Sequence, residues 1–123
     1  MKRKKLSLIA LGGAALLALS ACAGGDAGGG AAAPEPEETP TFEAGTTMAE
    51  LSEAGSITIG TKFDQPLFGL VGPSGEPEGF DVEIGKIIAA KLGIADDKIE
   101  WKETVSANRE PFVQQGEVDI VVA

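Results

Sequence analysis

The chain has 123 residues, with 10 basic and 19 acidic side chains, a formal net charge of −9, no histidine, no tyrosine and one cysteine. The negative charge disfavours nucleic acid or anionic lipid as a partner of the protein surface, and a single cysteine excludes an intrachain disulfide. Without a Ser/His pair or a cluster of metal ligands, nucleophilic and zinc chemistry are disfavoured. We therefore expect neither an enzyme nor a bound metal or cofactor.

Residues 1–21 have the organisation of a secretory signal peptide. A cationic stretch at residues 2–5 precedes an almost wholly apolar run at 6–19, which is too short for a comfortable membrane span. The run closes on Leu19-Ser20-Ala21-Cys22, which resembles the lipobox of bacterial lipoproteins. The resemblance implies that Cys22 carries a thioether-linked diacylglycerol and becomes the mature N-terminus, with its acyl chains in the lipid bilayer. A buried free thiol is the alternative, and the Gly/Ala-rich sequence after Cys22 argues against it.

Residues 22–45 contain Gly, Ala, Pro and Glu and hardly a large apolar side chain. Such a segment buries too little surface to offset the entropy of ordering it. We therefore expect a lipidated N-terminus followed by a flexible tether. A Pro/Glu recognition motif is the less favoured alternative.

Residues 46–123 carry the patterns of an α/β domain. In chain order they predict a helix over 48–54, with Thr47 and Glu50 as a capping box, a strand over 56–61, a hairpin around 73–77, a helix over 81–92, a strand over 98–103, a helix over 108–115 and a strand over 118–122. This order predicts a parallel sheet with right-handed crossovers. Because 118–122 is a continuous apolar run, we expect a central strand covered on both faces.

The helix expected over 81–92 has a clear start and stop. Asp81 can accept hydrogen bonds from the first backbone N–H groups, and Gly93 suits the end of a helix. At helical spacing, one apolar stripe is formed by Ile84, Ile87, Ile88 and Leu92. Together these features predict an amphipathic helix that packs on the sheet.

The order of residue types over 79–92 also resembles the signature of the family 3 extracellular solute-binding proteins, the amino-acid receptors of ABC importers. The resemblance covers residues 56–123. It implies a two-lobed, periplasmic-binding-protein-like (type II) fold, of which this chain would hold the first half of lobe 1. With the second lobe absent, we expect the chain to be an N-terminal fragment of a longer protein.

Two cations follow predicted strands at the edge where an open α/β sheet binds ligands. Lys62 comes directly after the strand at 56–61, and Arg109 lies near the start of the helix at 108–115, where a cation opposes the helix dipole. Together they predict an anion site, since arginine offers a bidentate fork and lysine a point charge. The alternatives are a solvated lysine and an arginine neutralised by Glu110.

The segments Gly60–Pro66, Ile99–Glu103 and Ser106–Glu110 resemble those of glutamate-binding members of the family. Members that bind basic or polar amino acids commonly have an acidic residue at the position of Lys62 and an aromatic lid at that of Gln65. The resemblance therefore implies a glutamate or aspartate ligand held by Lys62 and Arg109, with Asp64, Gln65 and Asn108 as weaker candidates. The family's arginine that clamps the ligand α-carboxylate would lie beyond Ala123.

We therefore expect an extracytoplasmic receptor, lipid-anchored on the outer face of the cell membrane, that delivers an acidic amino acid to an ABC permease. Three alternatives stay open. They are a sensory lipoprotein on the same fold, a receptor for glutamine or another polar amino acid, and an enzyme such as a dehydratase, because one fold can host several functions.

Overall fold

The computed structural model describes residues 32–123, and the predicted signal peptide and Cys22 lie outside them. In chain order the elements are α1 (Thr47–Ala54), β1 (Ile57–Thr61), β2 (Asp64–Gln65), β3 (Gly69–Val71), β4 (Pro77–Glu78), α2 (Phe80–Lys91), a 3₁₀ turn (Asp96–Lys98), β5 (Ile99–Glu103), a second 3₁₀ turn (Ser106–Asn108), α3 (Arg109–Gln114) and β6 (Ile120–Val121). No helix within the described residues is both long and apolar enough to cross a membrane.

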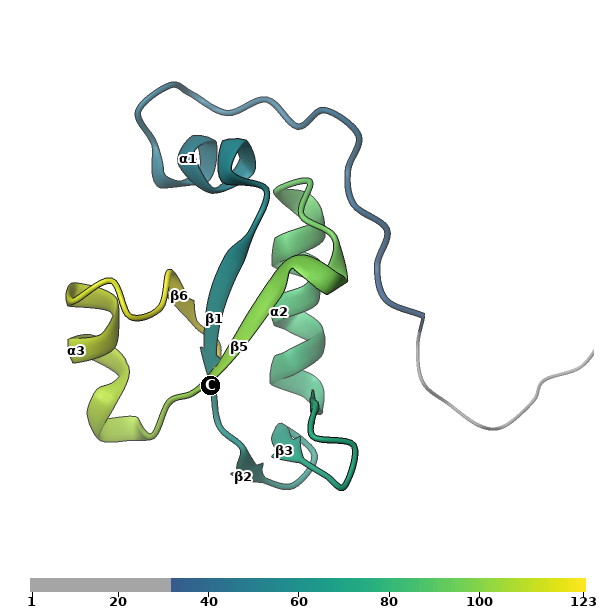
Figure 1. The fold of residues 1–123 in the computed structure, drawn as a ribbon, viewed down its shortest axis with the longest axis vertical. Helices are drawn as coiled ribbons and strands as arrows, with labels where there is room; N and C mark the ends of the chain where they lie inside the picture. The colour runs from purple at the N-terminus through teal and green to yellow at the C-terminus, as the bar shows by residue number, and fades with distance from the viewer. Residues whose placement is uncertain (1–31) are drawn as a thin grey trace, which may run out of the picture. The chain divides into compact units, whose positions relative to one another are not determined.

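A parallel sheet with the strand order β5-β1-β6 forms the centre of the domain (Figure 1). β1 pairs with β5 from Ile57–Ile99 to Thr61–Glu103 and with β6 at Ile59–Ile120. The predicted parallel α/β sheet is confirmed. The strand expected over 118–122 is found as β6 beside β1, but it is half-buried rather than covered on both faces.

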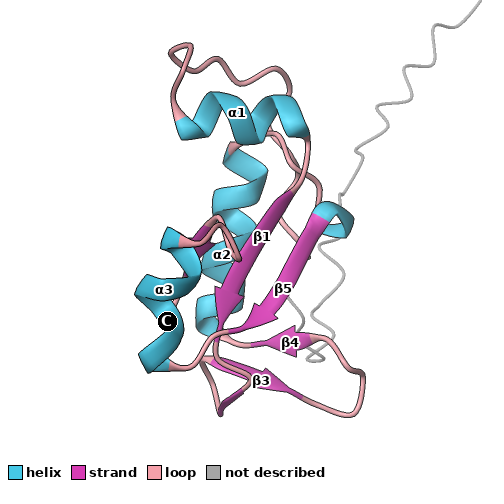
Figure 2. Ribbon diagram, turned by 60° about the vertical axis from the view of Figure 1, so that its left-hand side comes forward, coloured by secondary structure: helices cyan, strands magenta, loops and turns pink. Residues whose placement is uncertain are grey.

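The region expected to contain a hairpin forms a small antiparallel sheet of β2, β3 and β4 at the end of β1 (Figure 2). Its backbone approaches β1 closely at Gly69, where an added Cβ would lie 2.2 Å from the carbonyl oxygen of Lys62. At Gly79, with φ +134°, an added Cβ would lie 2.4 Å from the carbonyl oxygen of Phe68. Only glycine fits such approaches without displacing backbone.

Helix α2 packs on the sheet mainly through small residues and through only part of the predicted apolar stripe. Its buried residues are Val82, Gly85, Ala89 and Ala90, whereas Ile84 and Ile87 are exposed. Ala89 and the adjoining Leu92 and Ile94 form the core with Ile57 and Ile59 of β1. The stripe prediction is confirmed for Leu92, which is in the core, and for Ile88, which packs against it, and it is wrong for Ile84 and Ile87. Patterning by size overlooks Gly and Ala, which allow a helix to approach a sheet closely.

The ends of the helices also differ from the sequence predictions. α2 begins at Phe80 after Gly79 and has no side-chain cap, so Asp81 lies in the first turn instead of capping the helix. In α1 the capping hydroxyl belongs to Thr46, which accepts from the N–H of Ala49, rather than to Thr47. The helix predicted over 108–115 is found as α3, and Asn108 belongs to the 3₁₀ turn that precedes it. Such one- or two-residue shifts are common at helix boundaries.

Part of the segment predicted to be a tether contacts the domain. The backbone N–H of Glu37 donates to the carbonyl of Ala90 at 2.8 Å, and Phe42 packs against the core. These contacts differ from the expectation that residues 22–45 are flexible throughout.

Candidate functional site

The carboxyl ends of the three parallel strands meet at one edge of the sheet (Figure 1). Lys62 leaves β1 at this edge, and the loop that leads from β5 to Arg109 starts there. The two cations predicted from the sequence therefore lie at the same edge. This is the side on which open α/β sheets bind their ligands.

Lys62 is neither fully solvated nor free. Its Nζ lies 3.3 Å from Oδ1 of Asp64, and the lysine side chain is only 22% exposed whereas that of Asp64 is 67% exposed. Gly69 packs directly on the backbone of Lys62, so the small antiparallel sheet fixes the start of this loop. A half-buried ammonium in a fixed loop can bind an anion. That anion would compete with the Asp64 carboxylate for the Lys62 ammonium.

Arg109 is the first residue of α3, as the sequence predicts. Its Nε is buried and has no hydrogen-bond partner within the described residues. No carboxylate in residues 32–123 lies within ion-pair distance of its guanidinium, so Glu110 does not neutralise it in the way that the alternative reading requires. A buried N–H donor without an acceptor is costly, and an incoming carboxylate would satisfy it.

A groove of about 570 Å³ lies beside Arg109, between α3 and β6. It is lined by Arg109, Glu110, Val113, Gln114, Asp119, Ile120, Val121 and Ala123. The volume suits a small molecule. Lys62 does not line this groove, so the structure places the two cations at one edge but not in one cavity.

The weaker candidates have separate positions. Asp64 and Gln65 are both exposed in β2, where Asp64 pairs with Lys62. Asn108 is half-buried directly before α3 and makes no side-chain hydrogen bond to the helix. Asn108 and Arg109 are thus adjacent, whereas Gln65 is carried by the small antiparallel sheet. Among the described residues, no group of three or more acidic or thiol side chains could hold a metal ion.

Two threonines at the strand ends were not predicted as part of the site. Thr61 and Thr104 are both fully buried, and the N–H of Thr104 donates to the carbonyl of Thr61 at 2.7 Å. This bond continues the β1–β5 ladder past Glu103 and fixes the start of the loop to Arg109. The Oγ1 of Thr61 has no partner within the described residues. The signal in the sequence is their position: Thr61 ends the strand predicted over 56–61, and Thr104 directly follows the strand predicted over 98–103.

Comparison with protein families gives one match across most of the folded region. The bacterial extracellular solute-binding proteins, family 3, match residues 57–123. The glutamate-binding protein GluB of Corynebacterium efficiens is 41% identical over 87 residues, which are 66% of this chain and 29% of the relative. The glutamine-binding protein of Geobacillus stearothermophilus is 37% identical over 87 residues, 70% of this chain and 33% of the relative. The chain thus spans about a third or less of the curated relatives it matches.

Among solved structures, the solute receptor for L-cysteine of Neisseria gonorrhoeae is similar with a TM-score of 0.59 and 44% identity, covering 63% of this chain and 32% of that chain. The cysteine-binding protein of Campylobacter jejuni has the same TM-score at 31% identity, covering 63% and 31%. These neighbours are type II periplasmic binding proteins, so the predicted fold class is confirmed.

Proposed function

Because this chain belongs to the bacterial extracellular solute-binding proteins of family 3, we propose that it is part of a receptor that captures an amino acid outside the cell and delivers it to an ABC permease. The ligand is an acidic amino acid, glutamate or aspartate. The observation that carries the proposal is the buried, unpartnered Nε of Arg109 at the carboxyl edge of the sheet. A family of receptors also supports the expectation that the protein is not an enzyme.

Arg109 and Lys62 have different parts in this proposal. The guanidinium of Arg109 borders a groove of about 570 Å³ and donates to a carboxylate of the ligand. The ammonium of Lys62, half-buried at the end of β1, attracts the second carboxylate. Two relatives are named glutamate-binding proteins, at 41% and 44% identity. Asn108, Gln65 and Asp64 complete the rim of the site.

A glutamine receptor is the second candidate, and a specific observation favours it. Asp64 lies 3.3 Å from the Lys62 ammonium and already neutralises it. A site in which this ion pair persists would suit a neutral amide better than a second carboxylate. The Geobacillus stearothermophilus relative named a glutamine-binding protein is 37% identical. A sensory lipoprotein on the same fold would use the same site and differ in its membrane partner.

The proposed location is the outer face of the cell membrane. It depends on acylation of Cys22, which the lipobox-like sequence Leu19-Ser20-Ala21-Cys22 supports. Mass spectrometry of the N-terminal peptide from the protein produced in a bacterial host tests this part. A diacylglyceryl adduct on Cys22 supports the anchor, and an unmodified Cys22 peptide that still carries the signal sequence contradicts it.

Calorimetric titration of the complete mature protein with the twenty amino acids tests the ligand. We expect binding confined to glutamate and aspartate, lost in Lys62→Met and weakened about tenfold or more, roughly 1.4 kcal/mol, in Arg109→Ala. Lys98→Met is the matched control. Lys98 also pairs with a neighbouring aspartate at 3.3 Å, but it lies at the amino end of β5, away from the edge that bears Lys62. Binding of glutamine alone would mean that the protein is an amino-acid receptor whose ligand is glutamine and not an acidic amino acid.

A further inference from the structure

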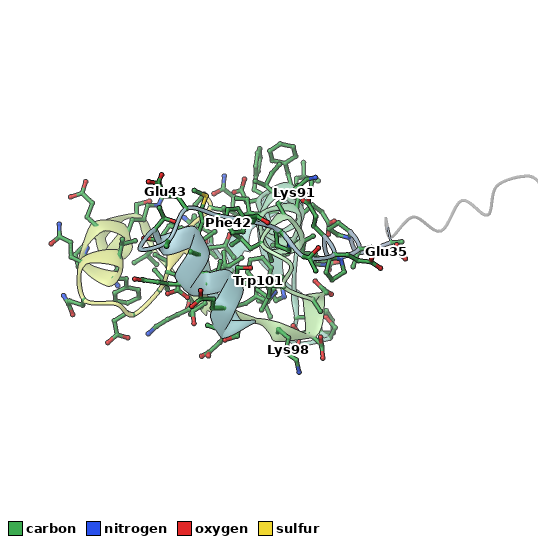
Figure 3. All side chains as sticks on the ribbon, turned by 90° about the horizontal axis from the view of Figure 1, so that it is seen from above. Glu35, Phe42, Glu43, Lys91, Lys98 and Trp101 are labelled. Atoms are coloured by element: carbon green, nitrogen blue, oxygen red, sulfur yellow. The ribbon has the colours of Figure 1, made fainter. Side chains whose placement is uncertain are left out.

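Residues 34–42, here called the N-terminal strap, cross the C-terminal half of α2 (Figure 3). The Glu37 N–H donates to the Ala90 carbonyl at 2.8 Å. The Ala90 carbonyl also accepts from the N–H of Gly93 at 3.0 Å, so the strap adds a further backbone bond to the last turn of α2. The strap thus has a specific backbone contact with the domain.

Contacts on both sides of Glu37 extend this attachment. Towards the N-terminus, Pro34 and Glu35 border a groove of about 440 Å³ together with Ile87 and Lys91 of α2. Towards the C-terminus, Phe42 packs against the core. Figure 3 shows the segment passing over the domain between Glu35 and Glu43, with Phe42 and Lys91 along its course.

The close approach of Pro40 restricts which residue fits at position 93. The ring carbons of Pro40 lie 3.1 Å from the position of a Cβ added at Gly93. Gly93 also has a φ of +77°, so glycine is favoured there by both its backbone conformation and the strap. The strap and the end of α2 therefore fit each other.

One contact of the strap contributes little. The carboxylate of Glu37 lies 3.5 Å from Lys91 Nζ, but the two side chains are 51% and 74% exposed. Ion pairs at such exposure contribute little to stability. The backbone bond of Glu37 and the packing of Phe42 must carry the attachment.

We propose that the N-terminal strap is a permanent part of the folded domain and fixes where the preceding chain leaves it. Helix α2 starts beside the small antiparallel sheet at the site edge and runs back toward the amino ends of the strands (Figures 1 and 2). From Pro40, which approaches Gly93 just after α2, the strap runs back to Pro34 beside Ile87, so the preceding chain leaves the domain along the side of α2.

For a receptor anchored at Cys22, which rests on the proposed function, the strap shortens the tether. Residues 23–33 can span at most about 40 Å when fully extended, whereas residues 23–45 could span about 80 Å. The anchored domain would then stay within that shorter distance of its attachment point.

Cleavage by a glutamate-specific endoprotease tests the strap in the complete mature protein without ligand. Cleavage after Glu38 and Glu43 requires the strap to detach. We expect the Glu37→Pro variant, which lacks the N–H donor, to be cut about five- to tenfold faster than the wild type. The matched control is Glu35→Pro, since Glu35 also follows a proline and its N–H has no partner within the described residues. It should be cut at the wild-type rate.

Two further variants separate the contacts. Phe42→Ala should also accelerate cleavage, and Lys91→Ala should change it less than twofold. The proposal is overturned if the wild-type protein is cut as fast as a synthetic peptide of residues 32–46, or if Glu35→Pro and Glu37→Pro accelerate cleavage equally. Cleavage depends on neither ligand nor acylation, so loss of the proposed function would leave this result unchanged.

Discussion

The indole ring of Trp101 occupies the space that a side chain at position 85 would need. A Cβ added at Gly85 would lie 2.6 Å from Cη2 of Trp101 and 3.3 Å from the end of Ile59. Helix α2 and strand β5 therefore pack with an aromatic ring against bare helix backbone. This contact explains a glycine in the interior of a helix, where glycine otherwise costs stability.

Substitution Gly85→Ala should destabilise the protein. Overpacking costs about 1–3 kcal/mol, which exceeds the gain of up to about 1 kcal/mol from replacing glycine in a helix. We expect a net loss of about 1–2 kcal/mol in the free energy of unfolding, measured by urea denaturation of the complete mature protein. In a Trp101→Leu background the ring is gone, and the same substitution should become neutral or stabilising. Equal losses in both backgrounds would contradict the contact.

Two glycines of the small antiparallel sheet should respond differently to alanine. At Gly69 an added Cβ would lie 2.2 Å from the Lys62 carbonyl oxygen, which is backbone and cannot move aside. Gly75 has φ +84° with nothing within 4 Å. Gly75→Ala should therefore cost only the left-handed backbone penalty of about 1–2 kcal/mol. Gly69→Ala should cost more and should also weaken ligand binding, because it displaces Lys62; thermal unfolding and calorimetry measure the two effects.

Leu67 has an unfavourable backbone conformation. Its φ is +73°, its side chain is 84% exposed, and its carbonyl accepts from the Phe80 N–H at 2.8 Å. Relief of the left-handed penalty of about 1–2 kcal/mol exceeds the entropy cost of glycine, about 0.5–1 kcal/mol, so Leu67→Gly should stabilise the protein by about 0.5–1 kcal/mol.

The control for this effect is Leu67→Ala, which removes the same exposed side chain but keeps the backbone penalty. Its midpoint of urea unfolding should stay near that of the wild type. If both substitutions raise the midpoint equally, side-chain exposure rather than backbone conformation is the cause.

The sequence predicted the elements of this domain better than their contacts. Alternation at 56–61 and the apolar run at 118–122 were sufficient for parallel strands, because periodicity depends on the chain alone. The order of the strands, β5-β1-β6 in the described sheet, is set by long-range packing and does not follow from periodicity. Likewise, Gly85 and Ala89 carried no hydrophobic signal, although they form the face of α2 that meets the sheet.

The candidate site shows the same limit. The motif and topology placed Lys62 and Arg109 at one sheet edge, where both are found. What could not be predicted is the state of each cation, since it depends on neighbours in space. Asp64 pairs with Lys62, whereas the Nε of Arg109 is buried without a partner. The contact of Glu37 with Ala90 was also not predicted. A Pro/Glu-rich composition favours disorder, and the sequence does not reveal that α2 lies beside this segment.

The Lys62–Asp64 pair gives the sharpest test of the ligand. If a ligand carboxylate competes with Asp64 for the ammonium, Asp64→Asn should tighten glutamate binding. An ion pair of this exposure contributes about 0–1 kcal/mol, so the gain should not exceed about fivefold in Kd. This gain in affinity should be smaller at high salt, because salt screens the exposed carboxylate of Asp64 most strongly. Calorimetric titration with glutamate at two salt concentrations measures both effects.

The matched control is Asp97→Asn, which breaks the Lys98–Asp97 pair at the same separation of 3.3 Å and changes the net charge equally. Because Lys98 lies at the amino end of β5, away from the site edge, this substitution should leave glutamate binding unchanged. An equal gain in both variants would assign the effect to net charge. A loss of binding in Asp64→Asn would instead mean that Asp64 itself contacts the ligand. A glutamine site would require such a contact if Asp64 accepts a hydrogen bond from the ligand ammonium or amide.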